Sequence, residues 1–366
     1  MRTNKILNNY LLKLFLITIY TFVILTGLLG CSDTKSDEVI NNIDEALEEV
    51  SPSSPEPVVL YRNPVSNLPV AEGKQRIRPI AIMINNRKVA TPQEGISRAD
   101  IWFEMPAEAE VNRIMAVFYD YADIKTIGTV RSARDYFVDF ALPLDALYIH
   151  YGGSPQFYIL DKKINLDDLD GINGRVHNTL FWRDQYRKKN AGYEHSVLTS
   201  GEKLWNGIPA LGRRNEINED YKPYFNFNEE DVTPAGTAAS TVKIKYSSYI
   251  SPVFKYNAEN KMYLREQYGA PHIDSAYNNE QITVKNILVL KTKVTPISGD
   301  TEGRVKVTTT GEGNGFYISN GKALEIIWRK KSREDKLELF DKNNNPLYLN
   351  TGKTWVSILS SEPVFE

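Results

Sequence analysis

The stretch "ADIWFEMPAEAEVNRIMAVFYD", residues 99–120, alternates apolar and polar side chains with the period of a β-strand. One side of its first half carries Ile101, Phe103, Met105 and Ala107, and the other carries Trp102, Glu104 and Glu108. The second half repeats a strand-like apolar run, so the pattern predicts a hairpin that folds back before Arg113. A half-buried hairpin of this kind needs further elements to cover its apolar side, and its neighbours in the sequence supply them.

The segments beside this hairpin combine strand and helix signals. "RPIAIMIN" (78–85) has the continuous apolar character of a buried strand, and the segments 126–144 and 146–163 each read as a strand followed by a helix. We therefore predict an α+β protein whose N-terminal domain, residues 61–230, is of α/β type with a mixed sheet.

The sequence pattern changes after about Thr241, where short runs of alternating apolar and polar residues are separated by turn signals. Asn320-Gly321 is the residue pair that a two-residue hairpin turn prefers. We predict a mostly antiparallel β domain over residues 238–366, a small barrel or sandwich, joined to the first domain by the Pro, Gly and Ala-rich segment 231–240.

The N-terminal sequence predicts where the protein is located. Residues 1–30 hold three cations and then an apolar run, which is the layout of a signal peptide, and Leu28-Leu29-Gly30-Cys31 resembles the lipobox of bacterial lipoproteins. Cys31 would then carry diacylglycerol, and the acidic segment 31–60 has the composition of a flexible tether. The alternative is an uncleaved membrane anchor, but it leaves the position of the only cysteine unexplained.

Composition excludes several kinds of site. A single cysteine cannot form an internal disulfide or a thiolate metal cage, and His150, His177 and His195 show no metal-ligand spacing. The chain after residue 60 is nearly neutral, so it lacks the basic surface that nucleic-acid binding requires. We expect no metal, no cofactor and no nucleic acid as partner.

Two junctions have the residues of an anion-binding site. Ser132 and Asp135 fit a capping box at a helix start that Arg131 and Arg134 flank. The second junction follows His150 and reads Gly152-Gly153-Ser154-Pro155, with Ser154 as the N-cap. If the two strands are neighbours, Arg131, Arg134, His150 and Ser154 would converge on one anionic group. In the alternative these residues are ordinary helix caps, with the arginines paired to Glu104, Glu108 or Asp135.

Catalytic patterns are weaker. Ser154 is followed by Pro155, which has no N–H to offer an oxyanion, so it is expected to cap a helix rather than act as a nucleophile. Glu108 and Glu110 are spaced as a pair of carboxylates on one strand face would be, a spacing that surface strands also carry. We therefore favour binding, and we keep a cell-wall-acting enzyme that uses Glu104, Glu108 or His150 as the alternative.

Several motifs together resemble the YerB-like family of bacterial lipoproteins, a two-domain family of unknown function. They include "RPIAIMINN", "EVNRIMAVF", "IGTVRSARDYF", "IHYGGSPQF" and "LYLNTGKTWVSIL", and the resemblance runs from about Asn63 to Ile358. It implies that the motif residues fall on Glu104, Glu108, Arg113, Arg131, Arg134, His150, Gly152 and Gly153. The sequence departs from the family after Glu108, where Ala109 and Glu110 replace an expected glycine pair, so the turn there is expected to be less tight.

These observations predict a lipoprotein on the extracytoplasmic face of the cell membrane, held there by acyl chains on Cys31. It would bind an envelope protein, a cell-wall ligand or another anionic envelope ligand. The candidate site residues do not indicate a particular chemical reaction.

Overall fold

The computed structural model describes residues 61–366. The expected signal peptide, Cys31 and the acidic tether all lie outside these residues. Among the described helices, none has the length and hydropathy needed to cross a membrane.

The hairpin predicted from residues 99–120 is confirmed. β2 (Ile101–Glu108) and β3 (Val111–Phe118) pair antiparallel, and β1 (Ile80–Asn85) pairs antiparallel with the other edge of β3. All six residues of β1 are buried, as the continuous apolar run requires. These three strands lie near the middle of an 11-stranded sheet.

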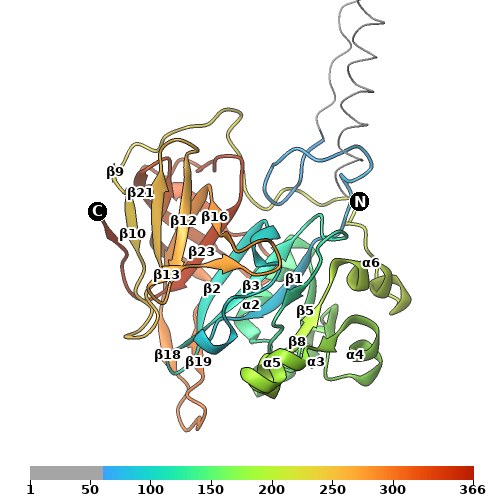
Figure 1. The fold of residues 1–366 in the computed structure, drawn as a ribbon. Helices are drawn as coiled ribbons and strands as arrows, with labels where there is room; N and C mark the ends of the chain where they lie inside the picture. Colours follow the sequence, from blue (N-terminus) through green and yellow to red (C-terminus); the bar gives the residue numbers. More distant parts are fainter. Residues whose placement is uncertain (1–60) are drawn as a thin grey trace, which may run out of the picture. The chain divides into compact units, whose positions relative to one another are not determined.

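The N-terminal end of this sheet is mixed, as predicted. β5 (Leu147–His150) runs parallel to β1, and β6 (Asp168–Asp170) runs parallel to β5. The helices of this part are α2 (Asp135–Ala141), α3 (Pro155–Ile164), α4 (Gly174–Leu180), α5 (Gln185–Asn190) and α6 (Gly201–Ala210). Figure 1 shows α3 to α6, in green, grouped beside β1 and β5.

Short elements connect these helices. A three-stranded antiparallel sheet contains β4 (Ile127–Gly128), β8 (Val197–Thr199) and β7 (Trp182–Arg183). The 3-10 helices are η1 (Lys88–Ala90), η2 (Ile96–Arg98), η3 (Leu142–Leu144) and η4 (Tyr193–His195).

The C-terminal half of the chain extends the same large sheet. Its strands are β17 (Asn286–Lys291), β20 (Gly311–Ser319), β21 (Lys322–Lys330), β22 (Glu338–Asp341) and β23 (Thr354–Leu359), with β9 (Thr237–Ala238) paired to β21. β23 lies between β17 and β2 and runs parallel to both. One sheet therefore passes through both halves of the chain.

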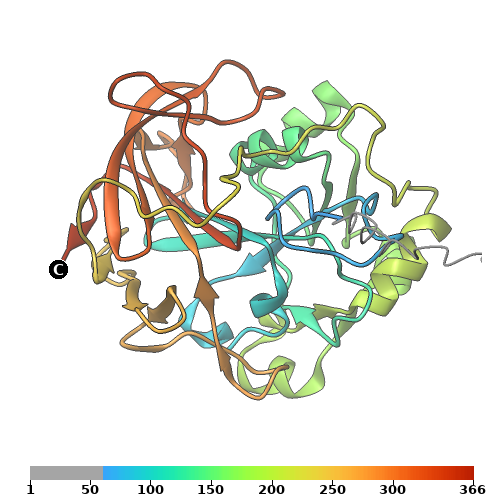
Figure 2. The same ribbon diagram turned by 90° about the horizontal axis from the view of Figure 1, so that it is seen from above.

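A second, antiparallel sheet faces the C-terminal part of the first. It is formed by β10 (Thr241–Lys243), β11 (Val253–Asn257), β12 (Met262–Gln267), β13 (Ala270–Pro271), β16 (Thr283–Val284) and β24 (Val364–Phe365). Phe254 packs on Trp355 with ring centroids 5.8 Å apart, and Phe316 packs on Phe365 at 5.2 Å. Seen from above in Figure 2, the strands of the C-terminal half, coloured from yellow to red, lie opposite the green helices. The prediction of an α+β protein with a mostly antiparallel C-terminal part is confirmed.

Two separate ribbons complete the fold. β14 (Ile273–Asp274) pairs with β15 (Glu280–Gln281), and β18 (Val294–Pro296) pairs with β19 (Val305–Val307). The second ribbon reaches back to the β2–β3 turn, where Ala109 N–H donates to the carbonyl of Gly303 at 2.6 Å.

The local turn and cap predictions had different outcomes. Asn320 and Gly321 both have positive φ, 51° and 75°, as a two-residue hairpin turn requires. Ser154 is the N-cap of α3 and accepts from the N–H of Phe157 at 3.1 Å. The predicted capping box at Ser132 was wrong: α2 begins at Asp135, and the Ser132 hydroxyl instead donates to the carbonyl of Tyr151 at 3.2 Å.

Candidate functional site

The two junctions predicted from the sequence lie side by side at the carboxyl ends of β1 and β5. Arg131 N–H donates to the carbonyl of Met83 on β1 at 2.8 Å, and Tyr151 N–H donates to the carbonyl of Arg131 at 3.0 Å. Ala133 forms a parallel bridge with Gly153. In sheets with parallel strands, this is the edge at which ligands usually bind.

Four arginine side chains surround this edge, and we call Arg87, Arg113, Arg131 and Arg134 the arginine cluster. Two of them share one carboxylate of β2. Glu108 Oε1 accepts from Arg113 Nη2 at 3.0 Å and from Arg134 Nη2 at 2.5 Å. Arg134, at the start of α2, thus contacts Glu108 at the end of the β2–β3 hairpin.

The other two arginines share Glu194, which belongs to η4. Arg131 Nη1 donates to the carbonyl of Glu194 at 2.5 Å, and its Nη2 lies 3.3 Å from Glu194 Oε2. Arg87 Nη1 lies 3.9 Å from Glu194 Oε1. Because four guanidinium groups face two carboxylates, the cluster keeps an excess of positive charge.

Several donors of the cluster are buried without a partner. The Arg113 side chain is only 1% exposed, and no atom among residues 61–366 accepts a hydrogen bond from its Nε or Nη1. The Nε atoms of Arg131 and Arg134 are also buried and unpaired within the described chain. An unsatisfied buried donor costs free energy, so the oxygens of a bound anion would relieve these groups.

Burial and charge shift the pKa values within the cluster. Burial lowers the pKa of Arg113 to about 10, because desolvation outweighs the nearby carboxylate of Glu108. Burial alone would raise the pKa of Glu108, but the guanidinium groups of Arg113, Arg134 and Arg131 hold it below the ordinary value for a glutamate. The carboxylate of Glu108 is therefore ionised at neutral pH.

Glu104 is not part of the cluster, although the sequence pattern places it on the same strand side as Glu108. It is fully buried and pairs with Arg265, whose Nη2 lies 3.0 Å from Glu104 Oε2. Trp355 Nε1 donates to the same oxygen at 3.1 Å, and Asn86 and Asn112 donate to Oε1. Glu104 therefore joins the two halves of the chain.

The structure places the His150 side chain among acidic partners rather than against the arginines. The Nε2 atom of His150 lies 2.7 Å from Asp168 Oδ2, and its Nδ1 lies 2.8 Å from the carbonyl of Gly152. The ring is fully buried and packs edge-on against Phe157 at 4.7 Å. Both ring nitrogens are engaged, so the expected convergence of His150 with Arg131 and Arg134 does not form.

The two glycines of the second junction have backbone roles. Gly152 has φ +77°, a conformation that side chains disfavour, and its N–H donates to Asp170 Oδ1 at 2.7 Å. A Cβ on Gly153 would lie 2.4 Å from the ring of Phe157. These glycines shape the loop, and Ser154 is occupied as the cap of α3.

Sequence reasoning missed Arg87 and Glu194. Glu194 precedes His195, whose Nδ1 lies 2.7 Å from Asn85 Nδ2 at the end of β1. Burial and the charge of Arg131 lower the pKa of His195, which keeps the ring neutral at pH 7. No grouping of three or more potential metal ligands occurs in the described part of the chain.

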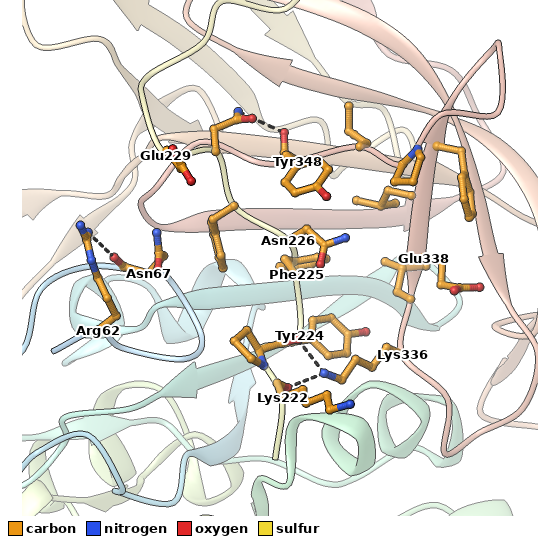
Figure 3. A pocket seen from close by; sticks show the side chains of 18 residues that line it. Arg62, Asn67, Lys222, Tyr224, Phe225, Asn226, Glu229, Lys336, Glu338 and Tyr348 are labelled. Atoms are coloured by element: carbon orange, nitrogen blue, oxygen red, sulfur yellow. Dashed lines mark hydrogen bonds between the residues drawn. The ribbon is translucent and has the colours of Figure 1, made fainter. Parts of the chain in front are cut away.

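The structure also contains a cavity that no sequence pattern predicted. It measures about 780 Å³ and lies between the segment 222–229 and strand β22 with its flanks, as Figure 3 shows. Lys336 Nζ spans it at one end, donating to the carbonyl of Pro223 at 2.6 Å. None of the residues predicted from the sequence lines this cavity, and its rim carries both signs of charge, among them Lys222, Glu229 and Glu338.

The fold is that of a two-domain α+β protein, because a mixed sheet in the N-terminal half is continued by mostly antiparallel strands in the C-terminal half. The arginine cluster lies at the carboxyl ends of β1 and β5. The chain matches the family described as "Protein of unknown function (DUF3048)", with its N-terminal domain over residues 65–214 and its C-terminal domain over residues 242–356. It belongs to this YerB-like family, as the sequence motifs indicated.

One curated relative comes from Bacillus subtilis (strain 168) and is named "Putative lipoprotein YerB". It is 26% identical over 309 residues, which are 83% of this chain and 88% of the relative. The crystal structure of YerB protein from Bacillus subtilis matches with a TM-score of 0.71 at 23% identity, and it covers 83% of this chain and 99% of that chain.

Proposed function

We propose that this protein is a lipoprotein, anchored through Cys31 at the extracytoplasmic face of the cell membrane, that binds an anionic envelope ligand at the arginine cluster. The observation that carries the binding proposal is the set of buried donors on Arg113, Arg131 and Arg134 that have no acceptor among residues 61–366. The lipobox-like sequence before Cys31 and the lipoprotein name of the Bacillus relative support the anchor.

The alternative of a wall-cleaving enzyme has less support from the geometry. Glu104 is fully buried and bonded by four side chains. Glu108 is held ionised by arginines, and a general acid of a glycosidase needs the opposite shift in pKa. His150 has both ring nitrogens engaged. These residues therefore fit positioning roles better than acid–base roles.

The anchor is tested by feeding cells that express the chain a clickable palmitate. We expect the wild-type protein to carry the label and to sediment with membranes, because acyl chains on one sulfur give lasting attachment. Cys31→Ser removes the only thiol of the chain and should remove both the label and the sedimentation. Label on the Cys31→Ser protein, or an unlabelled wild-type protein in the cytosol, would contradict the anchor.

The binding site is tested by titrating the full chain, in detergent, with inorganic phosphate as the simplest anion. Arg131→Ala should raise the Kd by about 10-fold or more, the effect of losing one charge-assisted hydrogen bond. Arg131 suits this test because it is partly exposed and its loss leaves the Glu108 pairs intact.

Arg329→Ala is the matched control. Arg329 lies on β21 and also pairs with a glutamate, Glu312, but it is not in the cluster. Its loss should leave the Kd unchanged. Equal affinity of the Arg131→Ala protein and the wild type, with the same thermal unfolding midpoint, would rule out this site.

A further inference from the structure

A groove of about 510 Å³ lies next to the arginine cluster. Its walls come from three places: the start of η1, the turn between β2 and β3, and two loops of the C-terminal half, residues 248–251 and 268–269. The groove thus lies where the two halves of the chain meet, which is a common place for ligand sites.

Arg87 connects the groove to the cluster. Its guanidinium pairs with Glu194, which also holds Arg131, and the same side chain lines the groove. On the opposite wall Glu110 follows Glu108 by two residues. A ligand whose anionic group contacts the cluster would therefore extend past Arg87 into the groove.

The lining of the groove combines an aromatic face with hydroxyl and carboxylate groups. Tyr249 lines the groove and is 73% exposed, so its ring is accessible to a ligand. The hydroxyl of Ser251 is buried and makes no hydrogen bond within the described chain. Glu110 is exposed, and within the described part of the chain its two carboxylate oxygens accept hydrogen bonds only from the hydroxyl of Ser248, at 3.1 and 3.3 Å.

This combination suits a sugar ring better than a purely apolar group. The C–H face of a sugar packs on an aromatic ring, and its hydroxyl groups need acceptors such as the Glu110 carboxylate and partners such as the Ser251 hydroxyl. Covering the exposed Glu110 carboxylate with a hydrocarbon chain would cost free energy, and a hydrocarbon offers no hydrogen bond to the Ser251 hydroxyl.

We propose that the groove binds the sugar ring of a sugar phosphate while the phosphate lies on the arginine cluster. This inference rests on the proposed function, since the cluster supplies the anion contact. It assigns Tyr249 as the residue on which the ring packs and Glu110 as the acceptor for its hydroxyl groups.

The experiment compares three probes on the full chain in detergent: inorganic phosphate, N-acetylglucosamine 1-phosphate and free N-acetylglucosamine. The sugar phosphate should bind about 10-fold more tightly than inorganic phosphate, the size of effect that aromatic packing together with one hydrogen bond produces. Tyr249→Ala should remove this gain and leave phosphate binding unchanged. Arg131→Ala should weaken the binding of both anions.

Tyr348→Ala is the control, because Tyr348 is also exposed but lines the other cavity. Equal affinity for the sugar phosphate and for phosphate, or an unchanged gain in the Tyr249→Ala protein, would overturn this inference and leave the proposed function intact. If Arg131→Ala does not weaken the binding of inorganic phosphate, both this inference and the proposed function are overturned. An equally tight complex with phenyl phosphate, which carries no sugar, would show that the groove does not select a sugar ring and would overturn this inference.

Discussion

At the scale of single residues, Ala109 shows how the chain departs from its family. It has φ 38°, in the left-handed region, where the resemblance leads one to expect glycine. The turn is nevertheless a tight one, because Glu108 pairs directly with Val111. The expectation of a looser turn was therefore wrong. Alanine in place of glycine instead leaves Ala109 with a strained, left-handed backbone conformation. Its N–H is also taken by Gly303 and is not free for a ligand.

Ala109→Gly should therefore stabilise the protein. Glycine adopts positive φ without the steric cost that alanine bears, so we expect the free energy of unfolding to rise by about 0.5–1 kcal/mol. Denaturation in urea, monitored by tryptophan fluorescence, measures it. Ala323→Gly, in the interior of β21, is the control and should destabilise the protein. A lower unfolding midpoint for Ala109→Gly would show that the turn is not strained.

At the scale of elements, a bulge in β2 determines which of its two glutamates belongs to the arginine cluster. The register of β2 against β3 shifts between Pro106 and Glu108. Glu104 consequently bonds to Asn112, while Glu108 bonds to Arg113, the next residue on β3, whose side chain points to the opposite face. A bulge of this kind redirects one side chain, and the alternating pattern of the sequence does not reveal it.

The sequence therefore predicted part of the site and missed the rest for identifiable reasons. Arg131 and Arg134 were predicted because they lie within one short motif after a strand. Glu194 lies 63 residues from Arg131 along the chain, in η4, and no local pattern links them. His150 was placed in the site by its position at a strand end, but Asp168 on the neighbouring strand binds its ring instead.

The ion pairs of Glu108 predict a dependence of stability on pH. Because the arginines lower its pKa in the folded protein, Glu108 contributes stability above the unfolded-state pKa, about 4.3, and this contribution is lost as the pH falls through the folded-state pKa. Glu108→Gln should thus lower the free energy of unfolding by about 2–3 kcal/mol at pH 7, less than for a fully buried pair because the Glu108 side chain is 23% exposed.

The difference between this variant and the wild type should shrink when urea denaturation is repeated below pH 4. Glu202→Gln, at an exposed position of α6, controls for the substitution itself. A difference that stays constant from pH 7 to pH 3 would show that the ionised form of Glu108 is not what stabilises the fold.

At the scale of the whole molecule, the structure is more continuous than the sequence suggested. The strand patterns predicted an α+β protein in two parts, and both parts are present. The segment 231–240, expected to join them, contributes β9 to the large sheet by pairing with β21. Pairing between strands far apart in the chain depends on tertiary packing and leaves no local sign in the sequence.

The position of β23 has a consequence for the order in which the protein matures. This strand lies between β17 and β2, yet it is close to the C-terminal end of the chain. As a ribosome makes the polypeptide, every other strand of this sheet emerges before the strand that joins its two parts. Until then, the backbone edges of β17 and β2 that β23 will occupy stay open and could pair with other chains. A nascent molecule therefore needs protection against aggregation until β23 has paired with both neighbours.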